Sequence, residues 1–159
     1  MVKGGTSGVG FESVNSLFSK GGTIYIANHS LDLITAAIEE VEAVPNTILG
    51  QVKGLQLNLA DLTTISTCFS TFLSQETRLD LHHNAGFNRQ PQGTVSKQCH
   101  QVHMATNFVG RFLLANLLLS ILLKTVELSS KALILVIYTL SGIMDLAAPP
   151  LGLSLASPS

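Results

Sequence analysis

The sequence has little of several features that mark particular classes of protein. Nine Lys and Arg residues face ten Asp and Glu residues, so there is no basic surplus to hold a nucleic-acid backbone. Only 12% of the residues are charged and 46% are apolar, which argues against a disordered chain. Two cysteines, Cys68 and Cys99, cannot form a disulfide framework. We therefore expect an ordered chain in a reducing, cytoplasmic setting that binds no nucleic acid.

Long apolar runs are also missing. The first ten residues lack the apolar core of a secretory signal. The most apolar helix-like run, residues 112–123, has twelve residues and contains Asn116, whereas a bilayer span needs about twenty. We expect a buried helix there and no transmembrane segment. The 159 residues suffice for one domain with a core.

Strand-like and helix-like segments alternate along the chain. Ser30 and Asp61 (or Thr63) are suited to cap two of the helices. A β-α-β alternation predicts a parallel sheet with helices on both faces, a three-layer Rossmann-type α/β fold. The last strand, which is almost wholly apolar, is expected to be buried on both faces. The expected helices are 9–20, 31–43, 61–74 and 96–127, with a break allowed before Thr106, and the expected strands are 23–28, 52–58, 79–82 and 132–139.

A glycine-rich segment, residues 4–10, leads directly into the first expected helix. Closely spaced glycines let backbone amides approach a pyrophosphate, and the helix N-terminus supplies free N–H groups and the positive end of the dipole. The alternative is a flexible, glycine-rich start to the chain. On its own the glycine cluster does not decide between the two.

Further motifs follow in an order that resembles one family, the short-chain dehydrogenases/reductases of fungal type. Residues 4–10 resemble its T-G-x-x-x-G-x-G turn, 83–86 its N-N-A-G motif, and 107–110 its N-x-x-G motif. Leu140 and Ser141 end a strand where the family places its catalytic serine, and 149–152 resemble the segment that follows. The resemblance extends over about residues 3–152, so it covers nearly the whole single domain.

The resemblance implies a nicotinamide cofactor. In this family the loop after the second strand faces the adenosine ribose, and an acid there selects NAD. Here residues 27–30 carry no acid, and His29 stands where similar sequences often carry Arg, which implies NADP; the alternative is an ordinary exposed histidine. Asn58 occupies the position of the Asp that accepts from the adenine amino group. The expected cofactor-binding residues are Gly4, Ser7, Gly8, Val9, Gly10, His29, Asn58, Asn84 and Gly86.

Three departures from the family pattern affect the expected chemistry. Only Met1 and Val2 remain of the central strand, and Lys3 replaces a threonine, so we expect unpaired strand edges in the middle of the sheet. Residues 78–84 are one residue shorter than in similar sequences and bring in two histidines. The 159 residues contain no Y-x-x-x-K motif, which in the family supplies the tyrosine that donates the proton and the lysine that assists it. The family's C-terminal strands are also missing, so we expect the sheet to be incomplete at both ends.

Several hypotheses for function stay open. The resemblance implies an NADP-dependent oxidoreductase of a small hydrophobic carbonyl or alcohol metabolite, of the kind found in fungal secondary metabolism. Asn107 and Ser141 are the only remnants of the catalytic tetrad, so catalysis is expected to be absent or severely impaired. The alternatives are a non-catalytic protein that binds nucleotide or a partner, and the product of a truncated gene. An apolar face over residues 112–123 implies either a homodimer or aggregation of the isolated chain.

Two other chemistries fit the sequence poorly. His100 and His103 stand three residues apart beside Cys99, and His82 and His83 are adjacent, which is a poor zinc pattern, so no metal is expected. A hydrolase would need a G-x-S-x-G turn, and Ser141 lacks the preceding glycine.

Overall fold

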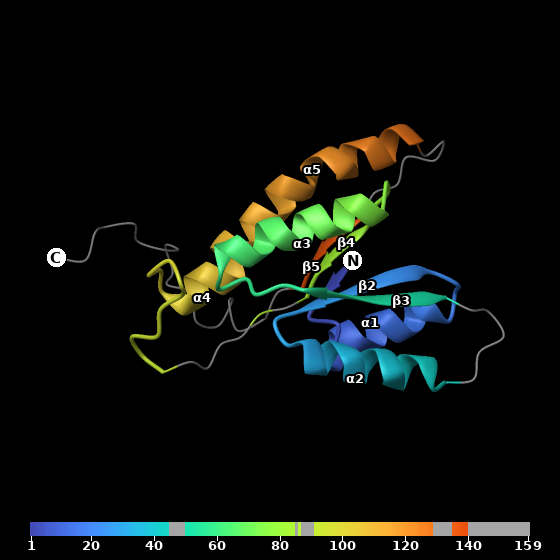
Figure 1. The fold of residues 1–159 in the computed structure, drawn as a ribbon, viewed down its shortest axis with the longest axis horizontal. Coiled ribbons are helices and arrows are strands. Elements are labelled where there is room, and N and C mark those ends of the chain that lie inside the picture. The colour runs from blue at the N-terminus through green and yellow to red at the C-terminus, as the bar shows by residue number, and fades with distance from the viewer. Residues whose placement is uncertain (45–49, 85, 87–90, 129–134, 140–159) are drawn as a thin grey trace, which may run out of the picture.

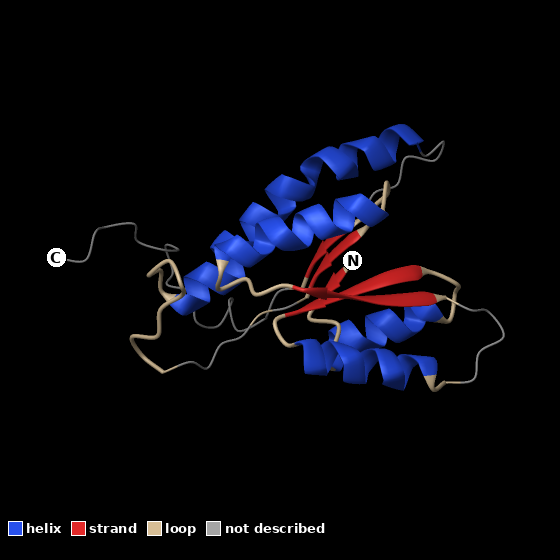
Figure 2. Cartoon of the chain, viewed as in Figure 1, coloured by secondary structure: helices blue, strands red, loops and turns tan. Residues whose placement is uncertain are grey.

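The computed structural model describes residues 1–44, 50–84, 86, 91–128 and 135–139. Its centre is a five-stranded sheet in the order β3-β2-β1-β4-β5, and every paired strand is parallel to its neighbour. Helices cover both faces of the sheet, as Figures 1 and 2 show. The three-layer Rossmann-type architecture expected from the sequence is therefore confirmed. The strands are β1 (Val2–Lys3), β2 (Thr23–Asn28), β3 (Gln51–Gln56), β4 (Leu81–His83) and β5 (Val136–Tyr138).

The strand β2 has the bounds that the sequence predicts. Five of its six residues are buried, because β-branched and aromatic side chains fill both faces of a central parallel strand. β3 begins one residue before the expected position, and β4 begins two residues after it. β5 is found within the expected 132–139, of which 132–134 lie outside the described residues. Its three residues are exposed rather than buried, because none of the described helices packs extensively against this edge strand.

The central strand corrects one expectation. Val2 and Lys3 form a two-residue strand that pairs with β2 on one side and with β4 on the other. Val2 stands opposite Ile26 and also opposite His82. The expectation that the first strand is missing is wrong, since these two residues pair on both sides and join the two halves of the sheet.

The helices α1 (Gly8–Phe18) and α2 (Leu31–Glu42) pack on one face of the sheet, and α3 (Leu62–Gln75) and α5 (Gly110–Leu128) lie on the other. Both expected caps are present. The Ser30 side chain accepts from Leu33 N, and the Asp61 carboxylate accepts from Thr63 N at 3.1 Å. Each cap satisfies a backbone N–H group that a helix start leaves without a partner.

The long helix begins later than expected. Residues 96–101 are not helical, and α4 (Val102–Met104) leads through a π-helical turn, η1 (Ala105–Val109), into α5. The expected break before Thr106 is this π-turn, which starts one residue earlier, at Ala105. Together the three segments form a helix of 27 residues, long and apolar enough to cross a membrane by length and composition alone. The twelve-residue run 112–123, on which the expectation of no transmembrane segment was based, is only part of this helix.

The packing of this helix places it in the core of the fold. Leu114 and Leu118 are fully buried, and they join Ile65 and Phe72 of α3 in one apolar cluster against the sheet. A second cluster, on the other face, contains Val14 of α1 and Val41 of α2. One stripe of α5 thus packs as the core-facing stripe of an amphipathic helix does.

Candidate functional site

The glycine-rich segment forms a tight turn between β1 and α1. Gly4 and Gly8 have φ angles of 76° and 54°, the left-handed region that favours glycine. Gly10 has an ordinary helical conformation but no space for a side chain. A Cβ atom there would lie 2.2 Å from the Gly4 carbonyl oxygen and 2.6 Å from the Asn84 side-chain nitrogen. Gly10 is therefore required for the close approach of α1 to the turn.

The N-terminus of α1 is open. Ser7 is the N-cap residue, and its side chain forms no capping hydrogen bond. The first turn of the helix contains no acid, and a Cβ atom at Gly8 would meet nothing within 4 Å. Among the described residues, none therefore covers the first N–H groups of the helix or the positive end of its dipole, which is the geometry of an anion site.

The carboxyl end of β2 is tied to this turn. The Asn28 side-chain amide donates to Thr6 Oγ1 at 2.6 Å, and its oxygen accepts from Ser30 N at 3.2 Å. His29 follows and is exposed. The sequence did not single out Thr6 or Asn28 as site residues, because the signal for them is a contact between segments 22 residues apart.

The carboxyl end of β4 supports the turn from the other side. Asn84 donates through its side-chain amide to the Gly4 carbonyl oxygen at 3.2 Å. Asn84 was expected to contact the cofactor, and the structure shows that it holds the glycine turn itself. Gly86 is exposed, and a Cβ atom there would lie 2.6 Å from an Arg111 guanidinium nitrogen and 3.2 Å from Asn107 Oδ1. The N-N-A-G-like segment therefore connects the turn to the start of the long helix.

Asn58 lies just beyond β3 at the same edge of the sheet. Its side-chain oxygen accepts from Ala60 N at 3.0 Å, and Thr64 Oγ1 donates to its carbonyl oxygen at 2.9 Å. An amide oxygen has two lone pairs, so one acceptor position is left for a ligand. Asp61, three residues on, is the helix cap that the sequence predicts.

Asn107 sits in the π-helical turn, and Gly110 starts α5 directly after it. A Cβ atom at Gly110 would lie 2.5 Å from the Leu59 carbonyl oxygen, so glycine lets the long helix approach the loop after β3. The N-x-x-G-like motif thus marks a bend and a close contact. The proton-relay role that the resemblance gives Asn107 stays a prediction.

Three basic side chains lie buried behind the turn, and the sequence analysis singled out only two of them, Lys3 and His83. Lys3 and His83 are opposite each other in the β1–β4 register, and Arg111 comes from α5. The pKa of Lys3 is lowered to about 8 and that of His83 to about 4, mainly by burial, and the positive charge of Arg111 contributes to both shifts. Tyr138 of β5 stacks on the His83 ring with centroids 4.7 Å apart. The sequence signal that could have identified Arg111 is that it is the one charged residue in the apolar stretch 105–123.

Part of the expected site lies outside the described residues, namely Ser141 and the segment 149–152. The serine position is therefore not tested. Within the part of the chain that the structure describes, no three His, Cys, Asp or Glu side chains converge as metal ligands. His82 instead contacts Thr139 through its ring nitrogen, Nε2 to Oγ1, at 2.9 Å.

The described site residues gather at one edge of the sheet. The glycine turn and the residues that follow β2, β3 and β4 all stand at the carboxyl ends of parallel strands. In open α/β sheets, ligands bind in the crevice at this edge. The turn is in place, its helix N-terminus is free, and no acidic side chain stands in the first turn of α1. These residues fit the pyrophosphate of a dinucleotide.

Comparison with known proteins agrees with this geometry. The family model described as short chain dehydrogenase matches residues 1–148. The short-chain dehydrogenase/reductase iacJ of Pestalotiopsis fici is 36% identical over 98% of this chain and 49% of its own length. A short-chain dehydrogenase/reductase of Phomopsis amygdali is 39% identical over 89% of this chain and 42% of its own length. The chain thus spans about half the length of the curated relatives it matches.

Solved structures share the fold at low sequence identity. The Pseudomonas aeruginosa RhlG/NADP active-site complex superposes with a TM-score of 0.70 at 19% identity, over 86% of this chain and 52% of that one. An alcohol dehydrogenase from Thermococcus sibiricus, complexed with 5-hydroxy-NADP, gives a TM-score of 0.64 at 17% identity, over 78% and 52%. The sheet order, the glycine turn and the family match together lead to one conclusion: the chain belongs to the short-chain dehydrogenase/reductase family.

Proposed function

We propose that this chain binds NADP(H) at the glycine turn, as the cofactor-binding part of an oxidoreductase for a small hydrophobic carbonyl or alcohol. The observation that carries the proposal is the open N-terminus of α1, which Gly4, Gly8 and Gly10 make accessible. Its free N–H groups would hold the pyrophosphate. Asn58 would accept from the adenine amino group. The cofactor supplies hydride chemistry when bound.

The preference for NADP over NAD rests on the end of β2. Residues 27–30 contain no acid to accept from a ribose 2′-hydroxyl, and His29 is exposed there. The acid that follows, Asp32, is in the first turn of α2, where it stabilises the helix dipole. Two structural neighbours are named as NADP or 5-hydroxy-NADP complexes, which supports the same cofactor here.

Turnover by these 159 residues alone is expected to be very slow. Tyr25 and Tyr138 are the only tyrosines, both lie in strands, and neither has a lysine four residues later. A serine hydroxyl and an amide are too weakly acidic to protonate an alkoxide, so Ser141 and Asn107 would bind and orient without replacing the proton donor. This observation favours a second candidate function, nucleotide binding without catalysis.

The apolar outer face of the long helix is the expected contact of a homodimer. Phe112, Leu119 and Leu123 are 65%, 49% and 57% exposed, although they are large apolar side chains. Pairing of this face with that of a second copy would remove it from water. We place the protein in the cytoplasm, and the fungal relatives are consistent with a role in secondary metabolism.

Isothermal titration with NADPH and NADH tests the cofactor. NADPH should bind more tightly, and His29→Arg should strengthen NADPH binding by about tenfold through a charged contact with the 2′-phosphate. His29→Asp should reverse the preference. His100→Arg adds the same charge at an exposed histidine outside the site and should change neither affinity. Tighter binding of NADH by the unaltered chain would refute the proposal.

Single-turnover oxidation of NADPH with a panel of aromatic and aliphatic ketones tests catalysis. We expect rates close to the uncatalysed reaction, and the same rates in the Ser141→Ala variant. A robust rate that falls when Ser141 is replaced would show a working active site, and the non-catalytic alternative would then be wrong.

A further inference from the structure

The buried ammonium of Lys3 has surroundings that are unusual for a charged side chain. Lys3 is only 6% exposed, and it is the last residue of β1, directly before the glycine turn. Among the described residues there are three ion pairs, and the Lys3 side chain takes part in none of them and in no side-chain hydrogen bond. A buried charge is normally paired, because its removal from water is costly. Lys3 therefore calls for an anion that the described residues do not supply.

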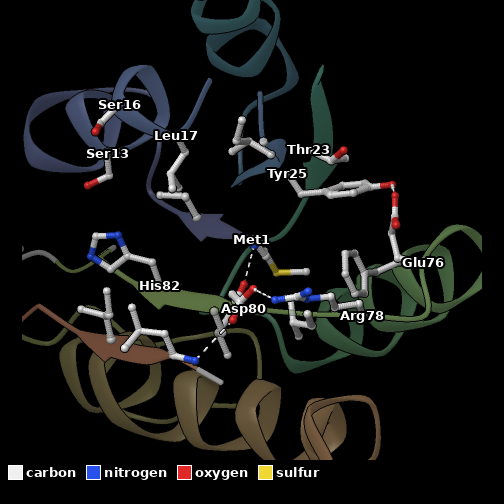
Figure 3. Close-up of a pocket in the computed structure, with 18 of the residues that line it drawn as sticks. Met1, Ser13, Ser16, Leu17, Thr23, Tyr25, Glu76, Arg78, Asp80 and His82 are labelled. Carbon is white, nitrogen blue, oxygen red and sulfur yellow. Dashed lines mark hydrogen bonds and ion pairs between the residues drawn. The ribbon is translucent and has the colours of Figure 1, made fainter. Parts of the chain in front are cut away.

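Two cations toward the opposite edge of the sheet are held differently. The Lys53 ammonium lies 3.1 Å from a carboxylate oxygen of Glu76, and the Arg78 guanidinium lies 3.6 Å from one of Asp80. Figure 3 shows Arg78 beside Asp80. The side chains of Lys53 and Arg78 are 38% and 61% exposed. Both cations are thus more exposed than Lys3, and each is balanced by a carboxylate.

The titratable groups that act on Lys3 from the described neighbouring elements carry no negative charge at pH 7. They are the Cys68 thiol of α3, the Arg111 guanidinium of α5 and the His83 imidazole of β4. Burial raises the pKa of the Cys68 thiol to about 11, so this thiol stays neutral. His83 is neutral as well, because burial lowers its pKa to about 4. Arg111 adds a second positive charge, so the cluster attracts an anion from outside.

This positive charge stands directly behind the turn that is proposed to bind the cofactor. Gly4, the residue after Lys3, donates through its backbone N–H to the Ala27 carbonyl oxygen at 2.9 Å, and its own carbonyl oxygen accepts from Asn84 at 3.2 Å. These bonds fix the turn next to Lys3. At an effective dielectric constant of about 20, two unit charges about 10 Å apart change an affinity by roughly tenfold. An effect of that size needs no direct contact.

We propose that the buried Lys3 ammonium is an electrostatic determinant of pyrophosphate binding, which attracts the phosphates of a dinucleotide across the glycine turn without touching them. In the free protein the unbalanced charge destabilises the fold, and the bound pyrophosphate offsets it. The inference rests on the proposed binding of NADP(H) at this turn. The two can fail separately, because NADPH could bind there with no contribution from Lys3.

Isothermal titration and urea unfolding of matched variants test the proposal. Lys3→Met removes the charge and keeps an unbranched side chain, so it should weaken NADPH binding about tenfold at pH 7 and raise the urea midpoint of the free protein. Lys20→Met removes an exposed charge that follows α1 at the other edge of the sheet, and it should leave the affinity unchanged. A purely structural role of Lys3 would not give opposite signs for affinity and stability. Wild-type NADPH affinity in Lys3→Met, or a stability below that of wild type, overturns the proposal.

The pH dependence of binding is a second measurement. Burial lowers the pKa of Lys3 to about 8 in the free protein, and a bound anion should raise this pKa because it favours the charged form. The affinity of wild type should therefore fall as pH rises above 8, and its advantage over Lys3→Met should disappear. Lys3→Arg keeps its charge at high pH, so it should bind NADPH as wild type does at pH 7 and show no such fall. An advantage over Lys3→Met that persists at pH 10 in wild type overturns the proposal.

A comparison of NADPH with NADH locates the anion that Lys3 attracts. Both cofactors contain the pyrophosphate, but only NADPH carries the 2′-phosphate, which is expected beside His29. Lys3→Met should therefore weaken both cofactors by the same factor. A loss confined to NADPH would place the attracted anion at the ribose and overturn the proposal.

Discussion

Replacing Gly10 by alanine tests how closely α1 must approach the glycine turn. The new Cβ atom would lie 2.2 Å from the Gly4 carbonyl oxygen and 2.9 Å from the Gly4 carbonyl carbon, and neither backbone atom belongs to a flexible side chain. Overpacking of this kind costs about 1–3 kcal/mol. Alanine regains about 1 kcal/mol over glycine in a helix. We place the cost near its upper limit and expect a net loss of about 2 kcal/mol, or about 4–8 °C in Tm.

The same substitution should weaken NADPH binding at least tenfold, because the helix N-terminus moves away from the turn. Urea unfolding and isothermal titration measure the two effects. Gly93→Ala is the control: unlike Gly10, Gly93 has no described atom within 4 Å of a Cβ, and it has a φ of 82°, so the variant should lose about 1 kcal/mol of stability without any change in affinity. Wild-type stability together with wild-type affinity in Gly10→Ala would refute the reasoning.

Three further predictions concern buried and capping charges. His83 has no hydrogen-bond partner for either ring nitrogen among the described residues, and its pKa falls from 6.5 to about 4, so acidification from pH 6.5 to 4 should destabilise the fold by about 2–3 kcal/mol. His83→Phe, which keeps the stack on Tyr138, should remove that share of the pH dependence in urea titrations; an unchanged profile would contradict this. Lys3→Met should raise stability at pH 7 by about 2–3 kcal/mol, and the gain should shrink as pH rises from 8 to 10.5; a less stable variant would show that Lys3 has a stabilising partner. Hydrogen bonds from Thr63 and Lys97 lower the pKa of Asp61, so Asp61→Asn should be less stable than wild type at pH 7 and equal to it well below pH 3.8, and a difference that persists in acid would refute this.

The sequence predicts those parts of the fold whose signal is local. β2 is found at the expected residues because a run of β-branched and aromatic side chains, preceded by two glycines, identifies a buried strand. The caps at Ser30 and Asp61 follow from residue type and position alone. In contrast, Val2 and Lys3 are too short a run to show the sequence pattern of a strand. They form a strand because they pair with β2 on one side and β4 on the other.

In the candidate site, too, local features were predictable from the sequence and long-range contacts were not. The glycine turn was predictable, because its conformation requires glycine at Gly4 and Gly8. The link from Asn28 to Thr6 was not, since it joins residues far apart in sequence. The same holds for Asn84, whose contact with Gly4 spans 80 positions. Long-range contacts decide which residues contact a ligand and which support those that do.

Amide chemical-shift mapping on the labelled chain, with NADPH added, tests the central claim most directly. The account predicts that the largest changes fall on Gly8, Val9 and Gly10, with smaller ones at His29. Resonances of Ile24 and Leu79, at the opposite edge of the sheet, should not move. Changes confined to that opposite edge, or none at saturating NADPH, would contradict the claim that this family member holds its cofactor at the glycine turn.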